Sequence, residues 1–342
     1  MLDFTSSQFL GWRHTTTGSS TPLTTGRPAA LDEPVGAILL AARIAAMQGA
    51  DAGVVHRTAL HALIDVLTVA SVAAGCLLID DAAYPLLGVA VAAAAGSLPV
   101  IRYRHHSVTD VRCAIAGFGP PPLVLTDGWC TGCSRPAPLA ALHAVVRQAG
   151  GLLVVDDTQA AGVLGSRASG AAFGIGGAGT LRWLGDTPRS VVQVASLAKG
   201  YGAPLSISTG SSGFIDAVRS AAMRWHSSPP TSADLAAADR ALTAEPSNAR
   251  RRQYLGALVV RLRVGLRRLG LPALGLPFPV VSIPVGAVRG QRLLARLRGL
   301  GIRALLVRAR CQPAAALTFA ISARHTAADI DRVLAGLARW SR

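Results

Sequence analysis

The sequence predicts an α/β fold, with a mostly parallel seven-stranded sheet in a large domain and a smaller C-terminal α+β domain. Two observations carry this prediction. Seven short apolar segments alternate with helical patterns up to residue 210, which is typical of a parallel sheet covered on both faces. A second set of strands and helices follows residue 245, and 342 residues exceed what one small core needs.

The domain boundaries follow from local composition. An N-terminal arm at 1–34, rich in Thr, Ser, Pro and Gly, is expected to be extended. The large domain is expected over 35–244 and the small domain over 245–342.

The elements of the large domain are predicted in chain order. Helices are expected at 35–48, 59–72, 140–148 and 231–244. One strand begins at Gly53 and ends before Thr58, and the others are expected at 76–79, 99–103, 122–126, 151–155, 191–194 and 206–209.

The small domain is predicted to mix strands and helices. Strands are expected at 277–285, 303–307 and 316–322, and helices at 248–269 and 291–300. A final helix opens at Thr326, where Thr326 and Asp329 form a variant of the capping box.

Composition excludes several classes of partner. The formal net charge is +16, but the arginines are scattered and no basic run is interleaved with aromatic residues. Nucleic-acid binding is therefore not expected, and the charge suits anionic substrates. The longest apolar region, 62–96, is interrupted by Asp65, Asp80 and Asp81, so no membrane span is expected. Five cysteines, an odd number, and a start without a signal pattern predict reduced thiols and a cytoplasmic location.

Lys199 is the only lysine in the chain, because every other strongly basic residue is arginine. An amine can lose its proton when it is desolvated, whereas a guanidinium cannot at working pH. The neutral amine can attack a carbonyl and form a Schiff base. A surface lysine retained by chance is the alternative, and the apolar residues before Lys199 disfavour it.

Polar residues follow several of the predicted strands. Tyr84, Asp127, Asp156 and Lys199 each come just after a strand, and ligands bind beyond the carboxyl ends of parallel strands. These four side chains are therefore expected to converge. The turn before the helix at 59 offers free backbone N–H groups that can hold a phosphate.

Six motifs follow one another along the chain. They are Asp3-Phe-Thr-Ser-Ser-Gln-Phe9-Leu-Gly11, Thr126-Asp127-Gly128, Val155-Asp156-Asp157-Thr-Gln159-Ala-Ala-Gly162, Ser196-Leu-Ala-Lys199, Ser227-Ser-Pro-Pro230 and His325-Thr-Ala-Ala-Asp329-Ile-Asp331. Together they resemble the motifs of fold type I pyridoxal-phosphate enzymes and, within them, the α-oxoamine synthases. This family includes 8-amino-7-oxononanoate synthase and 2-amino-3-ketobutyrate ligase.

The resemblance implies a pyridoxal 5'-phosphate cofactor and the condensation of an amino acid with an acyl thioester, carried by coenzyme A or a carrier protein. Lys199 would hold the cofactor as a Schiff base, Asp156 would pair with its ring nitrogen, Tyr84 would stack on the ring and Gln159 would reach its phenolic oxygen. Thr131 would contact the cofactor as well. The resemblance also implies a homodimer, in which Ser227 reaches the phosphate of the partner subunit. The other phosphate contacts would come from Thr58, Ala59 and Ser196.

The chain departs from the family pattern in three places. Gln159 and Tyr84 stand where the family carries histidines, and Gln159 cannot relay a proton. The family arginine that holds the substrate carboxylate falls on Ala316 or Thr318. Three arginines are candidate replacements for it: Arg308, Arg310 and Arg324. An aminotransferase and a catalytically silent homologue acting as a scaffold therefore stay open as alternatives.

Two other ligand sites are not favoured by the sequence. A metal site from His105 and His106 with Cys130 and Cys133 lacks regular spacing, and the Cys-x-x-Cys pair has no second pair, so no metal is expected. The glycine run at 174–179 fits a dinucleotide pattern, but no strand was recognised before it, so a flexible loop is expected.

Overall fold

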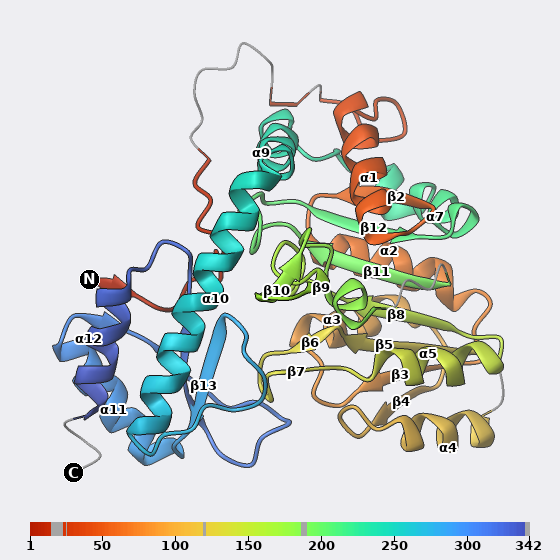
Figure 1. Cartoon of the computed structure of the whole chain (residues 1–342). Helices are drawn as coiled ribbons and strands as arrows, with labels where there is room; N and C mark the ends of the chain where they lie inside the picture. The colour runs from red at the N-terminus through yellow and green to blue at the C-terminus, as the bar shows by residue number, and fades with distance from the viewer. Residues whose placement is uncertain (15–22, 25, 119–120, 186–189, 339–342) are drawn as a thin grey trace.

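The computed structural model describes residues 1–14, 23–24, 26–118, 121–185 and 190–338. Its main sheet has seven strands in the order β2-β12-β11-β8-β5-β3-β4 (Figure 1). β12 runs antiparallel to both of its neighbours, and the other pairs of adjacent strands are parallel, as predicted. The strands are β2 (Ala52–His56), β3 (Cys76–Asp80), β4 (Val100–Tyr103), β5 (Pro122–Asp127), β8 (Leu152–Asp156), β11 (Val191–Ser196) and β12 (Ser206–Gly210).

Helices cover both faces of this sheet because its strands are apolar on both sides. Leu77 and Ile79 of β3 pack with one group of helices, whereas Leu78 between them packs with another. The first group is α2 (Ala59–Ser71), α3 (Pro85–Ala94) and α7 (Ser212–Arg219), and the second is α4 (Val108–Phe118), α5 (Leu139–Gln148) and α6 (Thr180–Leu184). A third apolar cluster, around β12, includes α1 (Val35–Gln48) and α9 (Ser232–Thr243).

The C-terminal part, residues 245–338, has its own antiparallel sheet in the order β13-β16-β15. Its elements are α10 (Glu245–Arg268), β13 (Val280–Pro284), α11 (Ala287–Gly299), β14 (Ile302–Arg303), β15 (Leu305–Val307), β16 (Ala316–Ala320) and α12 (Ala327–Ala338). The start of the N-terminal arm also belongs here, because β1 (Leu2–Asp3) pairs with β14 and the Phe4 and Phe9 side chains are fully buried in the same core. The domain boundary at 244 stays a prediction.

Short elements lie between the longer strands and helices. They are β6 (Trp129–Cys130), β7 (Arg135–Pro136), β9 (Ser166–Ala168), β10 (Ala171–Ile175) and α8 (Ala222–Trp225). The prediction of a flexible loop at 174–179 is wrong at its start, because Gly174 lies in β10. A Cβ on Gly174 would lie 2.3 Å from the carbonyl oxygen of Gly165, so the glycine permits a close approach of two chain segments.

The predicted ends of the C-terminal strands also differ from the structure. β13 begins at Val280 rather than 277, after Pro277 and Pro279, which cannot donate a ladder hydrogen bond. The segment 303–307 contributes to two sheets, because Arg303 pairs with Asp3 and Leu305 pairs with Thr318.

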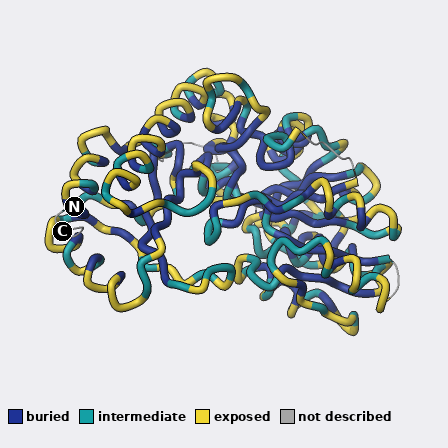
Figure 2. Tube along the Cα trace, turned by 60° about the horizontal axis from the view of Figure 1, so that its bottom comes forward, coloured by how far each residue is buried: buried dark blue, intermediate teal, exposed yellow. Residues whose placement is uncertain are grey.

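Burial follows these layers (Figure 2): the inner strands of the large sheet are buried, the edge strand β4 exposes Val100 and Arg102, and the helices expose their outer faces. In the described part of the chain, no helix combines the length and the apolar composition that crossing a membrane requires.

Candidate active site

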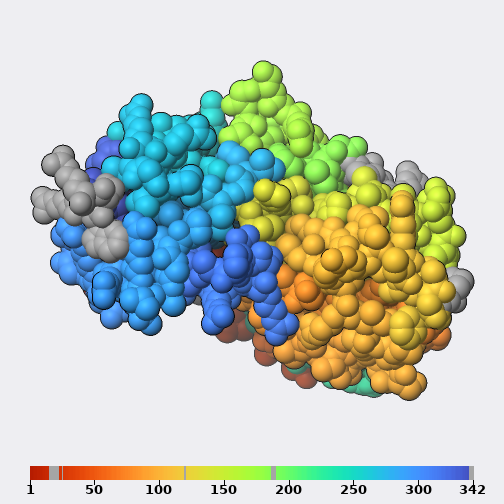
Figure 3. All heavy atoms as spheres, turned by 90° about the horizontal axis from the view of Figure 1, so that it is seen from below, coloured from red at the N-terminus to blue at the C-terminus, as the bar shows by residue number. Residues whose placement is uncertain are grey.

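A cavity of about 630 Å³ lies between the carboxyl ends of the large-sheet strands and the β15–β16 loop. Figure 3 shows residues near 310, in blue, lying against the orange residues of the large sheet's side of the molecule. One contact across this boundary is the hydrogen bond that Arg310 Nη1 donates to the carbonyl oxygen of Asp81, at 3.3 Å. Most of the predicted site residues line this cavity: Ala59, Tyr84, Thr131, Asp156, Gln159, Ser196, Lys199, Arg308 and Arg310.

Two carboxylates stand at neighbouring strand ends on the cavity wall. Asp156 ends β8 and Asp127 ends β5, and the two residues are register partners. The backbone N–H of Thr158 donates to Asp156 Oδ1 at 3.0 Å, and that of Tyr84 donates to Asp127 Oδ2 at 2.8 Å. Burial raises the pKa of both carboxyls, and the charge of Asp156 raises that of Asp127 further. The expected convergence of Tyr84, Asp127, Asp156 and Lys199 is therefore confirmed.

Lys199 lies in the turn that follows β11. This turn is fixed by hydrogen bonds, since Thr158 Oγ1 accepts from the Ser196 backbone N–H at 3.0 Å and Ser196 Oγ accepts from the N–H of Ala198 at 3.3 Å. Burial lowers the pKa of the Lys199 ammonium, while the charges of Asp156 and Asp127 oppose that shift. Lys199 therefore combines a nucleophilic atom with an environment that favours its neutral form.

Tyr84 and Gln159 present polar and aromatic surface to the same cavity. Lys199 Nζ lies 5.4 Å from the centroid of the Tyr84 ring, and Tyr84 is 52% exposed, so one face of the ring is available to a ligand. The Oε1 atom of Gln159 is buried without a hydrogen-bond partner among the described residues. A buried amide oxygen without a partner is costly, and a ligand that donates or shares a proton there would satisfy it.

Three predicted site residues do not line this cavity. Thr58 is the N-cap of α2, and its hydroxyl accepts from the backbone N–H of His61. Ser227 donates to the carbonyl oxygen of Met223 and lines a separate, smaller pocket. Arg324 is exposed, and its side chain packs beside Gly11.

One of the two positions onto which the family arginine falls carries a hydroxyl that already has a hydrogen-bond partner. Thr318 lies in β16 with its Oγ1 atom 2.9 Å from Ser282 Oγ, and both residues are buried. Neither Ala316 nor Thr318 lines the cavity, whereas Arg308 and Arg310 do. Of the arginines that line the cavity, Arg308 and Arg310 lie on the β15–β16 loop and Arg102 lies on β4.

Among the residues that line the cavity without a predicted site role are Asp127, Arg102 and Cys311. Asp127 had a signal, because it follows a strand, whereas Arg102 within β4 and Cys311 in the β15–β16 loop belong to no recognised motif. Cys311 lies close to His105, Cys130 and Cys133, which the sequence had considered together.

Comparisons with known proteins agree with this geometry. The family model described as aminotransferase class I and II matches residues 32–337. The 8-amino-7-oxononanoate synthase of Anaeromyxobacter sp. (strain K) is 31% identical over 322 residues, which cover 87% of this chain and 74% of that enzyme. The enzyme of the same name from Thioalkalivibrio sulfidiphilus is 31% identical over 248 residues, covering 70% of this chain. That match spans 61% of the Thioalkalivibrio enzyme, less than two thirds of its length.

Solved structures share the fold. A serine palmitoyltransferase from Sphingomonas wittichii superimposes with a TM-score of 0.82 at 17% identity, covering 98% of this chain and 86% of that one. An 8-amino-7-oxononanoate synthase from Francisella tularensis gives 0.76 at 16% identity, covering 99% and 97%. The chain therefore belongs to the aminotransferase class I and II family of pyridoxal-phosphate-dependent enzymes and, within it, to the α-oxoamine synthases.

Proposed function

We propose that this chain binds pyridoxal phosphate at Lys199 and condenses an amino acid with an acyl thioester, with loss of carbon dioxide. One observation carries the proposal: Lys199, Asp156 and Gln159 line one cavity of a chain whose family uses this cofactor. The lowered pKa of Lys199 and the buried, unpartnered Oε1 of Gln159 fit the cofactor's aldehyde and phenolic oxygen. When it is bound, the cofactor supplies a ring that accepts the electrons of a carbanion at the amino acid's α-carbon.

Each residue then has a role set by its position. Asp156 lines the cavity and would pair with the ring nitrogen, where its negative charge would keep that nitrogen protonated. Gln159 would contact the phenolic oxygen, and Tyr84 would stack on the ring, since both side chains line the same cavity. Lys199 is the base that moves protons at the substrate α-carbon, since its amine reaches the cavity and burial lowers its pKa.

The cofactor phosphate is assigned to the N-terminus of α2. Ala59 is the first residue of this helix and lines the cavity, so its turn presents backbone N–H groups to an anion. Ser196 and Thr131 also line the cavity and add hydroxyl groups, while Thr58 keeps the helix end in place as its cap.

The substrate carboxylate is assigned to the β15–β16 loop. Arg308 and Arg310 line the cavity, whereas Arg324 does not. No side-chain hydrogen bond or ion pair joins Arg308 to the described part of the chain, so its guanidinium can take a carboxylate in two parallel hydrogen bonds. This support for Arg308 and Arg310 weakens the case for Arg324.

An assay of substrates separates the proposed reaction from its alternatives. The purified protein is incubated with a panel of amino acids, with an acyl-coenzyme A or acyl carrier protein, or with a keto acid. Release of free thiol together with carbon dioxide is the expected result. Consumption of a keto acid without thiol release would instead assign the chain to transamination, which the replacements at Tyr84 and Gln159 motivate. If neither thiol release nor keto-acid consumption is observed, the catalytically silent homologue is the interpretation that is left.

The site is further proposed to be completed in a homodimer in the cytoplasm. Several apolar side chains near the start of α1 are exposed, including Val35 at 70% and Leu39 at 65%. Ser227 lies on this side as well, because its carbonyl oxygen accepts from the backbone N–H of Ala29. A second copy of the chain would cover these groups and bring Ser227 to its phosphate. Light scattering should give a dimer for the native chain and a monomer for Leu39→Asp; a monomeric native chain that holds the cofactor tightly would refute the assignment of Ser227.

A further inference from the structure

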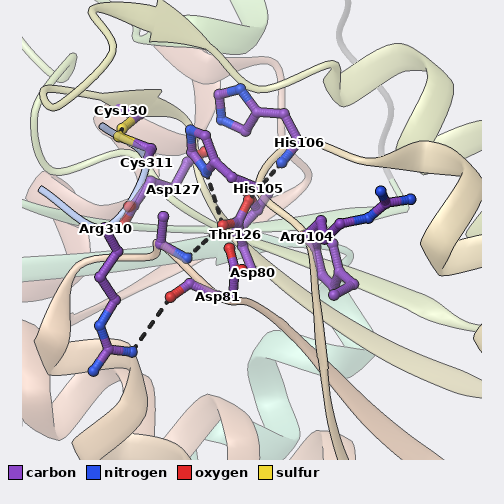
Figure 4. A network of polar contacts seen from close by, with 12 residues as sticks. Asp80, Asp81, Arg104, His105, His106, Thr126, Asp127, Cys130, Arg310 and Cys311 are labelled. Atoms are coloured by element: carbon purple, nitrogen blue, oxygen red, sulfur yellow. Dashed lines mark hydrogen bonds and ion pairs between the residues drawn. The ribbon is translucent and has the colours of Figure 1, made fainter. Parts of the chain in front are cut away.

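Three thiols and one imidazole meet beside the cavity, and two of the thiols, those of Cys130 and Cys311, line it. They come from four separate places: His105 follows β4, Cys130 lies in β6, Cys133 lies in the turn after β6, and Cys311 lies in the β15–β16 loop. Their ligand atoms all lie within 4.8 Å of one another. Figure 4 shows the sulfur atoms of Cys130 and Cys311 next to each other, with the His105 ring beside them.

The distances match those of a tetrahedral zinc site. Zn–S bonds of about 2.3 Å and Zn–N bonds of about 2.0 Å place two thiolates about 3.8 Å apart and a thiolate about 3.6 Å from an imidazole nitrogen. Cys130 Sγ lies 3.6 Å from Cys311 Sγ, and His105 Nε2 lies 3.4 Å from Cys133 Sγ. Both of these distances are within a few tenths of an ångström of the expected values, and all four ligand atoms lie within 4.8 Å of one another.

A buried carboxylate orients the histidine from behind. Asp80 Oδ1 accepts from His105 Nδ1 at 2.8 Å, so the Nε2 lone pair faces the thiols. Asp80 is itself fixed, because it accepts from the backbone N–H groups of Ala82 at 2.9 Å and His106 at 3.0 Å. A carboxylate on the outer nitrogen of a ligating histidine is the usual arrangement at zinc sites.

We propose that His105, Cys130, Cys133 and Cys311 bind one Zn²⁺ ion. Three thiolates and one imidazole, tetrahedrally arranged, select zinc over harder divalent ions. No metal is expected from the sequence at His105 and His106 with Cys130 and Cys133, because the spacing is irregular and no second Cys-x-x-Cys pair is present. The structure supplies Cys311 in place of His106. This proposal does not depend on the cofactor or on the reaction.

A disulfide is the competing use of these thiols. The 3.6 Å between Cys130 Sγ and Cys311 Sγ is well beyond the ~2.0 Å of a bonded pair. A disulfide between them would also leave Cys133 and the oriented His105 without a role. Four converging ligands are explained together by a metal ion and only in part by a disulfide.

The zinc ion would fasten the substrate side of the cavity. Cys311 follows Arg310 directly in the sequence. A zinc ion that joins Cys311 to Cys130 and Cys133 on the β6 hairpin (β6, β7 and the turn between them) would therefore hold the arginine-bearing loop over the cavity. The two segments already touch, because a Cβ on Gly132 would lie 2.5 Å from the Cβ of Ala309. The metal is therefore structural: it links the C-terminal part to the large sheet beside the site.

Metal content and thiol protection test the proposal. The full chain, purified under reducing conditions without chelator, should carry one equivalent of Zn²⁺. After chelation it should take up one equivalent of added Zn²⁺ or Co²⁺, and the Co²⁺ form should show the visible absorption of tetrahedral thiolate coordination. Zn²⁺ should protect three thiols from a thiol reagent, while Cys113, exposed on α4, should stay reactive.

Variants separate the site from general thiol chemistry. Cys311→Ser and Cys133→Ser should each weaken Zn²⁺ binding at least tenfold, whereas Cys113→Ser, the matched control, should bind as the native chain does. Asp80→Asn should weaken binding about 10- to 100-fold while all four ligands remain. If Cys311→Ser does not fold, titration of the chelated native chain still decides the question.

Three results would overturn the proposal. The first is a native chain that neither retains Zn²⁺ nor binds it after chelation. The second is equal Zn²⁺ affinity in Cys113→Ser and Cys311→Ser. The third is a Cys130–Cys311 disulfide, found by peptide mass mapping, in native chain that was purified under reducing conditions.

Discussion

The two walls of the cavity differ in how closely they follow the family pattern. The wall formed by the strand ends of the large sheet carries Asp156 and Lys199 in the family's motifs. The opposite wall, formed by the β6 hairpin and the β15–β16 loop, lacks the family arginine and carries Arg308 and Arg310 instead. Under the proposed assignment, the strand ends hold the cofactor, and the group that holds the substrate carboxylate has moved to another loop of the same cavity.

Replacement of Lys199 should have the largest effect, because it removes the nucleophile of the cofactor wall. Both Lys199→Ala and Lys199→Arg should lower kcat/KM by about 10³-fold or more, since arginine keeps the charge but cannot act as a neutral amine. Steady-state kinetics with the active amino acid measure this, and circular dichroism checks the fold. An Arg variant within tenfold of the native chain would show that charge alone is required.

Asp156→Asn should follow, with a fall in kcat of about 10²-fold and little loss of bound cofactor. The amide cannot hold the proton on the ring nitrogen, so the ring accepts electrons poorly. Asp157→Asn is the matched control, because Asp157 bonds to Thr180 instead and does not line the cavity. Equal kinetics for the two variants would contradict the role given to Asp156.

Changes on the substrate wall should affect KM more than kcat. Arg308→Ala or Arg310→Ala should raise KM for the amino acid about 10- to 100-fold, as expected for a lost charge-assisted hydrogen bond of about 1.5–3 kcal/mol. Arg324→Ala, whose side chain does not line the cavity, should leave KM within about twofold. An effect confined to Arg324 would place the carboxylate elsewhere and undo the contrast between the walls.

The smallest predicted effect concerns Asp157 and the pH dependence of the free energy of unfolding. Burial raises the pKa of Asp157 to about 7, whereas the carboxyl in the unfolded chain titrates near 4. Between these values the folded chain binds the extra proton, so this residue makes the free energy of unfolding fall as pH rises from about 4 to 7. The free energy of unfolding of the native chain minus that of Asp157→Asn should therefore decrease as the pH rises from about 4 to 7. A difference that increases with pH would mean that the carboxylate is the form stabilised by folding.

Most of the large sheet could be predicted from the sequence, because its strands are short apolar runs bounded by turns. α1 occupies the predicted residues, and each of the seven strands lies within a few residues of its predicted position. No range was predicted for α3, α4, α6, α7 or α8, and of the residues of α4 only Val111 is buried. Strand ends in the C-terminal part were set by proline positions and by pairing with the N-terminal residues, which local patterns do not encode.

The two walls also differed in how far the sequence could describe them. Lys199 and Asp156 stand in motifs, so their place in one cavity could be predicted. Cys311 and the β15–β16 loop could not be assigned, because their neighbours in space are about 180 residues away in the chain and lie on β6. That convergence depends on the packing of the C-terminal part, which single-sequence reasoning did not supply.

Chemical trapping of the cofactor tests the central claim most directly. The native chain, loaded with pyridoxal phosphate, is reduced with borohydride, digested and mapped by mass spectrometry. The pyridoxyl group should be found on the peptide that contains Lys199, which is the only lysine of the chain. A native chain that takes up no cofactor, or that leaves the Lys199 peptide unmodified after reduction, would contradict the assignment of this cavity as the active site.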